Sequence, residues 1–237
     1  MKKIVALCSV FLVFGCAELQ QIASQYPEMG GTILSNADIS AGLKEALHKG
    51  ISQQVTKLTA TDGFYKNEAV KILLPAELQK VDKALRSVGM SSLADEGLKV
   101  LNRAAENAVK EATPIFVDAV TKMTITDAKN ILLGNETSAT TYLQSATTSS
   151  LYGKFNPVIK SSFSKVGADK VWSNIITKYN AIPMVNKVNP DLTDYVTNKA
   201  LEGVFKMVAV EEVQIRNNIS ERTSDILKRV FALQDNK

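Results

Sequence analysis

Apolar residues recur every three or four positions through most of this chain, and this spacing limits the possible folds more than any other feature of the sequence. The clearest example covers residues 38–58, where one stripe contains Ile39, Leu43, Leu47, Ile51, Val55 and Leu58. Such spacing is typical of a helix with one buried face. Residues 35–38 are all plausible N-terminal caps or first-turn residues. We therefore predict a long helix from about Asp38 to about Leu58.

The next part of the chain carries the start and stop signals of two further helices. Pro75 suits the first position of one helix, and Gly89 ends it. The other is predicted over residues 91–113, with a stripe of mostly small residues, namely Ala94, Gly97, Leu98, Leu101, Ala104, Ala105, Ala108 and Ala112. Because small side chains let a neighbouring helix approach closely, we place this helix near the centre of a bundle. Arg103 points the other way, and we expect it to face solvent.

The middle of the chain, residues 114–144, predicts three short helices in quick succession, against which the longer helices pack. Thr124 or Thr126 can cap the second of these, and Asp127 suits its positive N-terminus. Gly134 is a helix stop, and a third helix is predicted to open near Thr137.

The rest of the chain predicts four more helices: residues 151–166 with a bend at Gly153 or Pro157, residues 168–180, a long helix from Asp191 or Thr193 to Asn217, and a last one from Ser220 to Phe231. Only residues 70–74 could form a strand, and they could equally form a helical turn. The predicted fold is all-α, a single domain over residues 37–234, built as a bundle of roughly eight to ten helices.

The amino terminus has the pattern of an export signal. Lys2 and Lys3 precede an apolar run over residues 4–14, which as a helix would span only about half of a bilayer core. We therefore predict that residues 1–15 are a signal peptide and not a membrane span. Residues 13–16, Val-Phe-Gly-Cys, resemble the lipobox of bacterial lipoproteins, in which the chain is cut before the cysteine and the thiol of that cysteine carries a diacylglycerol.

This resemblance predicts a lipid on Cys16 and a tether over residues 16–36. An ordinary signal peptide with a chance cysteine is the alternative. Cys8 would leave with the signal, so the mature chain would have no disulfide and would depend on its own core. By resemblance to lipoprotein sorting, Ala17 after the cysteine favours the outer membrane. We expect a cell-envelope protein that is lipid-anchored there and faces the periplasm.

Seven segments, spread over nearly the whole mature chain, share a pattern in the same order: residues 39–47, 62–64, 71–75, 123–128, 131–134, 139–142 and 211–216. Taken together, they resemble the bacterial domain-of-unknown-function family 4197. The resemblance implies a mainly helical, exported or lipid-anchored protein of Gram-negative bacteria. It implies no activity and no ligand. Asn217 follows Arg216 where the family pattern leads us to expect a proline.

The composition excludes several kinds of chemistry. The single histidine, His48, cannot supply a catalytic triad or a histidine-rich zinc site, and we expect it to be a partly exposed surface residue. Loss of Cys8 and lipidation of Cys16 would leave no cysteine nucleophile. The formal charge is +4 with Lys2 and Lys3 included, and no dense basic run indicates nucleic-acid binding. We expect no metal and no cofactor.

Glu211 is the most interesting acid, because it falls on the apolar stripe of the predicted helix that ends at Asn217. A buried carboxylate needs a basic partner or a proton. Arg216 is the nearest candidate, although Glu212 is better placed for it at a spacing of four. Arg222 or another helix could supply the partner instead. The two interpretations are a buried polar binding site and a structural ion pair.

Hydroxyl side chains crowd one segment, which contains Thr137, Ser138, Thr140, Thr141, Ser145, Thr147, Thr148, Ser149 and Ser150. They could form the wall of a polar groove, or simply a solvated helix face with local caps. Our candidate residues for binding a ligand or partner are Asp127, Thr140, Tyr142, Glu211 and Arg216.

Three functions fit these observations. The first is a non-enzymatic module that binds an envelope protein or, between its helices, an apolar small molecule. The second is a carboxylate-dependent hydrolase of envelope polymers, with Glu211 as a candidate. The third is a structural or assembly role.

Overall fold

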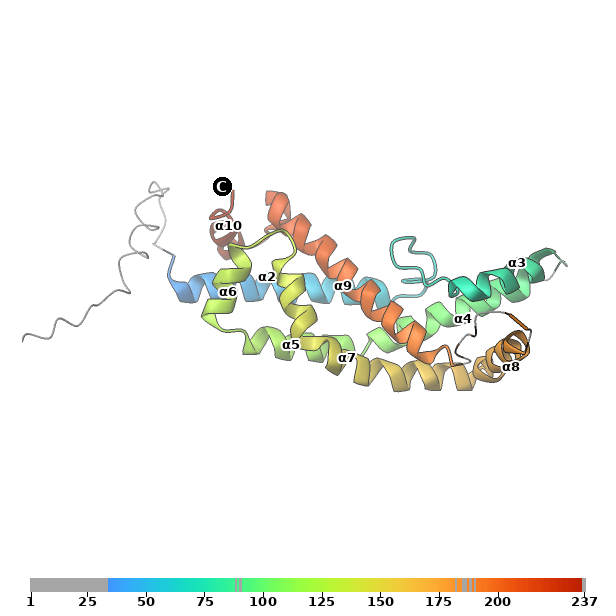
Figure 1. Cartoon of the computed structure of the whole chain (residues 1–237). Coiled ribbons are helices and arrows are strands. Elements are labelled where there is room, and N and C mark those ends of the chain that lie inside the picture. Colours follow the sequence, from blue (N-terminus) through green and yellow to red (C-terminus); the bar gives the residue numbers. More distant parts are fainter. Residues whose placement is uncertain are drawn as a thin grey trace, which may run out of the picture. The chain divides into compact units, whose positions relative to one another are not determined.

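Helices form the regular secondary structure of the part of the chain that the computed structural model describes, which is residues 34–235 apart from 88, 90, 182, 185, 186, 188 and 190. In chain order the elements are α2 (Asn36–Thr59), η1 (Ala76–Leu78), α3 (Gln79–Ser87), α4 (Ser91–Val109), α5 (Ala112–Lys122), α6 (Ile125–Leu132), α7 (Ser138–Lys165), α8 (Ala168–Asn180), α9 (Thr193–Asn217), η2 (Ile219–Glu221) and α10 (Asp225–Phe231) (Figure 1). The prediction of an all-α, multi-helix fold is confirmed.

Three long helices, α2, α7 and α9, provide most of the internal packing surface. Helix α7 packs along α9 and α4, while α2 packs against α5, α6, α9 and α10. The predicted apolar stripe of α2 is buried at Leu43, Leu47, Ile51, Val55 and Leu58. Each such side chain stabilises the fold by about 1.5–3 kcal/mol through removal of apolar surface from water. Helix α10 packs against α2, so the first and last helices of the described residues are in contact.

The irregular segment between α2 and η1 is held to α4 by side chains and not by a β-ladder. Val70 ends a turn, and residues 71–74 form neither a strand nor a helical turn, so neither sequence interpretation describes this segment. Instead, Asn102 Oδ1 accepts from the Ile72 amide at 2.8 Å, and Asn102 Nδ2 donates to the Ile72 carbonyl at 2.9 Å. Asn102 is fully buried. One side chain thus supplies the two hydrogen bonds that a neighbouring strand would offer.

The expectation that Arg103 faces solvent was wrong, because its side chain is partly buried and paired. Its guanidinium donates to Asp62 at 2.6 Å and to Glu106 at 2.5 Å. Glu106 in turn accepts from the amides of Phe64 and Tyr65. The pKa of Asp62 is lowered mainly by its hydrogen bond with Lys66, and also by the positive charges of Lys66 and Arg103. These contacts fix the turn that follows α2 against the middle of α4.

Several predicted helix boundaries were wrong, and two of the differences involve prolines. The short helix predicted to open near Thr137 and the helix predicted over residues 151–166 are one continuous helix, α7. The helix predicted over residues 91–113 ends at Val109, and α5 begins at Ala112 so that Pro114 lies in its first turn, where the missing N–H does no harm. No break occurs near Pro157, which lies inside the 28-residue α7. The residue four positions earlier is Gly153, and both positions are exposed, so water can bond the carbonyl that loses its partner.

The last helix starts later than predicted. Ser220 lies in the short η2, and α10 begins at Asp225 after Ser224, whose hydroxyl accepts from the Leu227 amide. The predicted helices over residues 168–180 and up to Asn217 are confirmed.

Gly203 of α9 is required by the close approach of Phe64, and this gives a testable prediction. A Cβ at Gly203 would lie 2.8 Å from Phe64 Cε1, and Phe64 is fully buried. We expect Gly203→Ala to lower the free energy of unfolding by about 1–3 kcal/mol, because the ring must move within a packed core. The matched control is Gly153→Ala in α7, where a Cβ meets nothing within 4 Å. It should stabilise the chain by about 0.5–1 kcal/mol. Equal effects of the two changes in urea titrations would refute this packing.

Candidate functional site

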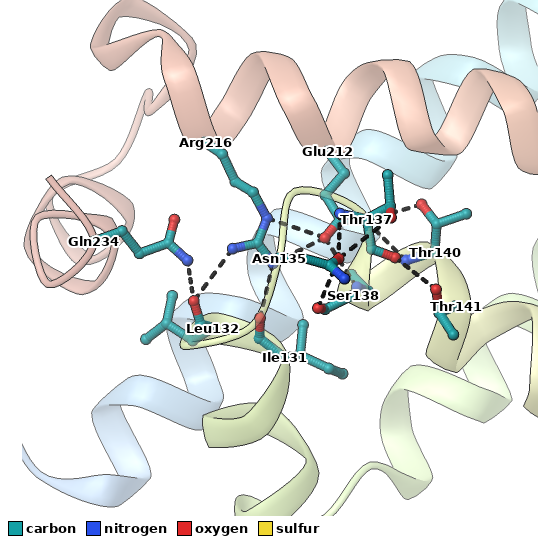
Figure 2. A network of polar contacts seen from close by, with 11 residues as sticks. Ile131, Leu132, Asn135, Thr137, Ser138, Thr140, Thr141, Glu212, Arg216 and Gln234 are labelled. Atoms are coloured by element: carbon teal, nitrogen blue, oxygen red, sulfur yellow. Dashed lines mark hydrogen bonds and ion pairs between the residues drawn. The ribbon is translucent and has the colours of Figure 1, made fainter. Parts of the chain in front are cut away.

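A buried ion pair on α9 meets the junction between α6 and α7, where it is part of a network of polar contacts (Figure 2). Glu212 and Arg216 are spaced four residues apart, so both project from the same face of α9. Their side chains are 6% and 5% exposed. Residues 133–137 connect α6 to α7 directly beside them.

The carboxylate of Glu212 binds the first turn of α7. Its Oε1 accepts from the Ala139 amide at 2.9 Å, and its Oε2 accepts from the Thr140 amide at 2.8 Å and the Thr140 hydroxyl at 2.9 Å. The first amides of a helix lack partners within the helix and lie at the positive end of its dipole. Glu212 therefore acts as an N-terminal cap for α7, supplied from a helix more than seventy positions away.

The guanidinium of Arg216 binds the last turn of α6. Its Nη2 donates to the Ile131 carbonyl at 2.8 Å, and its Nη1 donates to the Leu132 carbonyl at 3.2 Å. It also contacts Glu212 Oε1 through Nε at 3.0 Å and Nη2 at 2.8 Å. A cation at a helix C-terminus is favourable for the same reason that an anion is favourable at an N-terminus. The pair thus joins α9 to both helices of the α6–α7 junction.

Two amide side chains complete this region, which we call the junction network. Asn135 Oδ1 accepts from the Thr137 amide at 2.9 Å and from the Ser138 hydroxyl at 3.1 Å, which fixes the loop before α7. Gln234, beyond α10, donates through Nε2 to the Leu132 carbonyl. The C-terminal end of the described chain is therefore tied to the same helix end as Arg216.

A groove of ≈ 380 Å³ opens beside the junction network. Its walls come from the α6–α7 loop, the end of α9 and the segment after α10, and its lining residues are Gly134, Asn135, Glu136, Arg216, Asn217, Gln234 and Asp235. The lining presents carboxylate, amide and guanidinium groups beside a similar amount of apolar surface. Such groups recognise a ligand by hydrogen bonds and charge.

Glu211 is buried as its place on the apolar stripe predicts, but Arg216 is not its partner. Gln54 Nε2 of α2 donates to Glu211 Oε2 at 2.5 Å, and among the described residues no ion pair to Glu211 is present. Gln54 Oε1 is buried and has no hydrogen-bond partner. The helices meet closely here, since a Cβ on Gly50 would lie 3.0 Å from Glu211 Cγ. A cavity of only ≈ 20 Å³ adjoins Glu211, which is room for about one water molecule.

The other sequence candidates divide between the junction network and a separate location. Thr140 and Arg216 are brought together by Glu212. Asp127 forms a capping box with Thr124 at the start of α6, and these hydrogen bonds lower its pKa. Tyr142 donates to the Ala119 carbonyl at 3.5 Å, and burial, followed by the Asp127 charge, raises its pKa. Cys16 lies outside the described residues.

Sequence reasoning recognised Glu212 only as a possible partner of Arg216, and missed its role as the centre of the junction network. The spacing of four was the available signal. Gln54 and Gln234 gave no signal, because their partners lie far away in the sequence. Asn135 was also missed, although its partners Thr137 and Ser138 are local and an asparagine just before a helix is a recognisable turn signal. Of the hydroxyl-rich segment, Thr141, Thr147 and Thr148 donate to carbonyls of their own helix. Those three hydroxyls thus do not favour the groove-wall interpretation.

A comparison with protein-family models shows the family to which this chain belongs. A model described as a protein of unknown function, DUF4197, matches residues 33–232. The chain belongs to the DUF4197 family. The match runs from just before α2 to just after the end of α10, so the DUF4197 domain includes the junction network apart from Gln234. No curated protein and no solved structure matches the chain.

Within the described part of the DUF4197 domain, no group of three or more His, Cys, Asp or Glu side chains is placed to hold a metal ion. No helix there is long and apolar enough to span a membrane. His48 is partly exposed on α2, as predicted. What the junction network can do chemically is hold three helices in fixed relative positions and present hydrogen-bonding groups in the groove.

Arg222 caps the C-terminus of α9, and its pairing with Asp235 gives a pH prediction. It donates to the carbonyls of Ile215 and Arg216 and pairs with Asp235 through two contacts at 2.6 and 2.7 Å. This pairing holds the pKa of Asp235 below its ordinary value. A lowered pKa in the folded state means that the stabilisation is present above the ordinary carboxyl pKa of about 3.9 and is lost as the pH falls below it.

We therefore expect the wild-type protein to be more stable than Asp235→Asn at pH 7, with the difference shrinking between pH 4 and pH 3. Urea titrations at pH 7, 5, 4 and 3 measure it. A difference that stays constant down to pH 3 would show that Asp235 does not act through its charge.

Proposed function

We propose that this protein is a lipid-anchored, non-enzymatic binding module of the bacterial cell envelope. In this proposal residues 1–15 are removed as a signal peptide, Cys16 carries the lipid, and residues 16–36 tether the helical domain to the outer membrane on its periplasmic side. The lipobox-like residues 13–16 support the anchor. An acylated N-terminus with more than one chain would hold the protein stably at the membrane.

The groove beside the junction network is the observation that carries the binding function. Its polar groups sit on helix ends and on a loop that Glu212, Arg216 and Asn135 hold in place. Side chains that are already ordered lose little conformational freedom when a partner binds. A groove built in this way is therefore suited to recognition of a polar partner surface.

The size of the internal cavity favours a protein partner over an apolar small molecule. Pockets for small organic ligands usually measure about 300–1,000 Å³. The cavity between α2, α9 and α10 measures ≈ 20 Å³. The hydrolase alternative gains no support from Glu211, whose carboxylate borders this same small cavity and is bonded to Gln54.

A crosslinked pull-down from the native membranes tests the proposal. The tagged, lipidated protein is compared with Asn217→Trp, which places a large ring in the groove, and with Asn198→Trp, which alters an exposed asparagine elsewhere on the same helix. We expect Asn217→Trp to lose the partner and Asn198→Trp to keep it. Equal recovery of the same proteins with both variants would contradict a groove-based binding function.

The anchor is tested separately by fractionation of Cys16→Ser. We expect this variant to leave the membrane fraction and to migrate without the lipid. A Cys16→Ser protein that stays membrane-bound and is processed identically would overturn the lipid anchor, and leave the groove to be judged on the pull-down alone.

A further inference from the structure

We propose that the groove beside the junction network takes an extended peptide segment that carries a basic side chain. The inference rests on the proposed binding function and names the class of partner. Two features of the lining lead to it: the unused hydrogen-bonding groups of three amide side chains, and one unbalanced negative charge.

Three side-chain amides in the groove favour a peptide as its occupant. Asn135, Asn217 and Gln234 all line the groove, and each uses one end of its amide inside the protein. In the described structure this leaves Asn135 Nδ2, Asn217 Oδ1 and Gln234 Oε1 without a partner from the chain itself. A side-chain amide pairs well with a backbone N–H and C=O, as Asn102 does with Ile72 at 2.8 and 2.9 Å in this same protein.

The charges that line the groove favour a basic side chain on that peptide. Arg216 is balanced by Glu212, and Asp235 is balanced by Arg222. Glu136 is exposed, and its contact is with the neutral amide of Asn217 at 3.4 Å. The groove therefore keeps the negative charge of Glu136, which attracts a lysine or arginine side chain and repels an acidic one.

The lining favours peptide over carbohydrate as the occupant. Proteins often place an aromatic ring against the apolar face of a sugar, whereas the groove is lined by amides, carboxylates, one guanidinium and a glycine. These groups match the alternating donors and acceptors of an extended backbone. Carbohydrate binding is accordingly an outcome that the test must be able to reveal.

The probe is acetyl-Gly-Gly-Lys-Gly-Gly-amide, titrated into the isotope-labelled helical domain with its tether and followed by the NMR shifts of backbone amides. We expect shifts at Gly134, Asn135, Glu136 and Asn217, with a dissociation constant on the order of 1 mM. The peptide with Glu in place of Lys should bind about three-fold more weakly or worse, because one solvent-exposed ion pair contributes modestly. Chitotetraose serves as the carbohydrate probe.

Charge reversal gives the decisive comparison. We expect Glu136→Lys to invert the preference, so that the Glu peptide binds better than the Lys peptide. The matched control Glu45→Lys, an exposed glutamate on α2, should leave the preference unchanged. An unchanged preference in Glu136→Lys, shifts located away from the groove, or binding of chitotetraose alone would each overturn the inference.

These outcomes are separable from failure of the proposed function. If the membrane partner is lost in Asn217→Trp while the peptides give no shift at the groove, the binding function stands and the peptide assignment is wrong. If Asn217→Trp retains every partner while the Lys peptide binds as expected, the groove binds peptide but does not recruit the native partner, and the proposed function is wrong.

Discussion

Replacing Arg216 with methionine should lower the free energy of unfolding by about 3–5 kcal/mol, the largest effect that we expect from any polar substitution in this protein. The change leaves Glu212 as a buried carboxylate without its cation and leaves the carbonyls of Ile131 and Leu132 without their donors. Urea titration followed by circular dichroism measures the effect.

The chain offers a matched control with the same charges and spacing. Lys122 and Asp118 also form an ion pair at a spacing of four, with a 2.7 Å contact, but their side chains are 73% and 61% exposed. Lys122→Met should reduce stability by at most about 1 kcal/mol. The double variant Glu212→Gln with Arg216→Met should regain part of the loss, because the unpaired charge is removed. If Arg216→Met and Lys122→Met have equal effects, the junction network does not stabilise the fold.

The second large effect is expected at Asn102, whose substitution by alanine should lower the free energy of unfolding by about 2–4 kcal/mol. The reason is that the buried N–H and C=O of Ile72 both lose their partner, and an unsatisfied buried polar group carries a penalty of about 1–3 kcal/mol. We also expect faster tryptic cleavage after Lys66 and Lys71, because the segment between α2 and η1 is released from α4.

Asn107 provides the control for this prediction, since it is an exposed asparagine on the same helix. Asn107→Ala should be neutral or slightly stabilising, because alanine favours a helix more than asparagine does. A loss of stability in Asn102→Ala without faster cleavage of the segment would mean that Asn102 does not hold it in place.

The helices that the sequence predicts well are those whose signals are local. The stripe of α2, the stop at Gly89 and the start near Thr193 all depend on spacing or on a residue within one turn. Predicted helix boundaries were wrong where one local sequence signal is compatible with two structures. Pro157 can end a helix or lie within one, and the exposed surface of α7 at residues 153 and 157 allows the second.

The polar contacts of the candidate site were less predictable, for a physical reason. The spacing of Glu212 and Arg216 indicates that they can meet, and they do. Their other partners, at the end of α6 and the start of α7, are fixed only when the helices pack. Asn102 and Arg103 show the same limit, because the segment that they hold has no secondary structure of its own to predict.

These features describe a DUF4197 domain in which two buried charges on α9 cap two other helices and fix the walls of a polar groove. Recognition by preordered polar groups does not require a catalytic residue, which is consistent with a binding role.

A photo-crosslinking amino acid, incorporated in living cells at Asn217 and in a second strain at Asn198, tests this account most directly. Both positions are exposed on α9, but among the described residues only the first lines the groove. The account predicts a defined crosslinked product from position 217 that is absent from position 198 and is suppressed by Glu136→Lys. Crosslinking from position 198 with none from position 217 would contradict it.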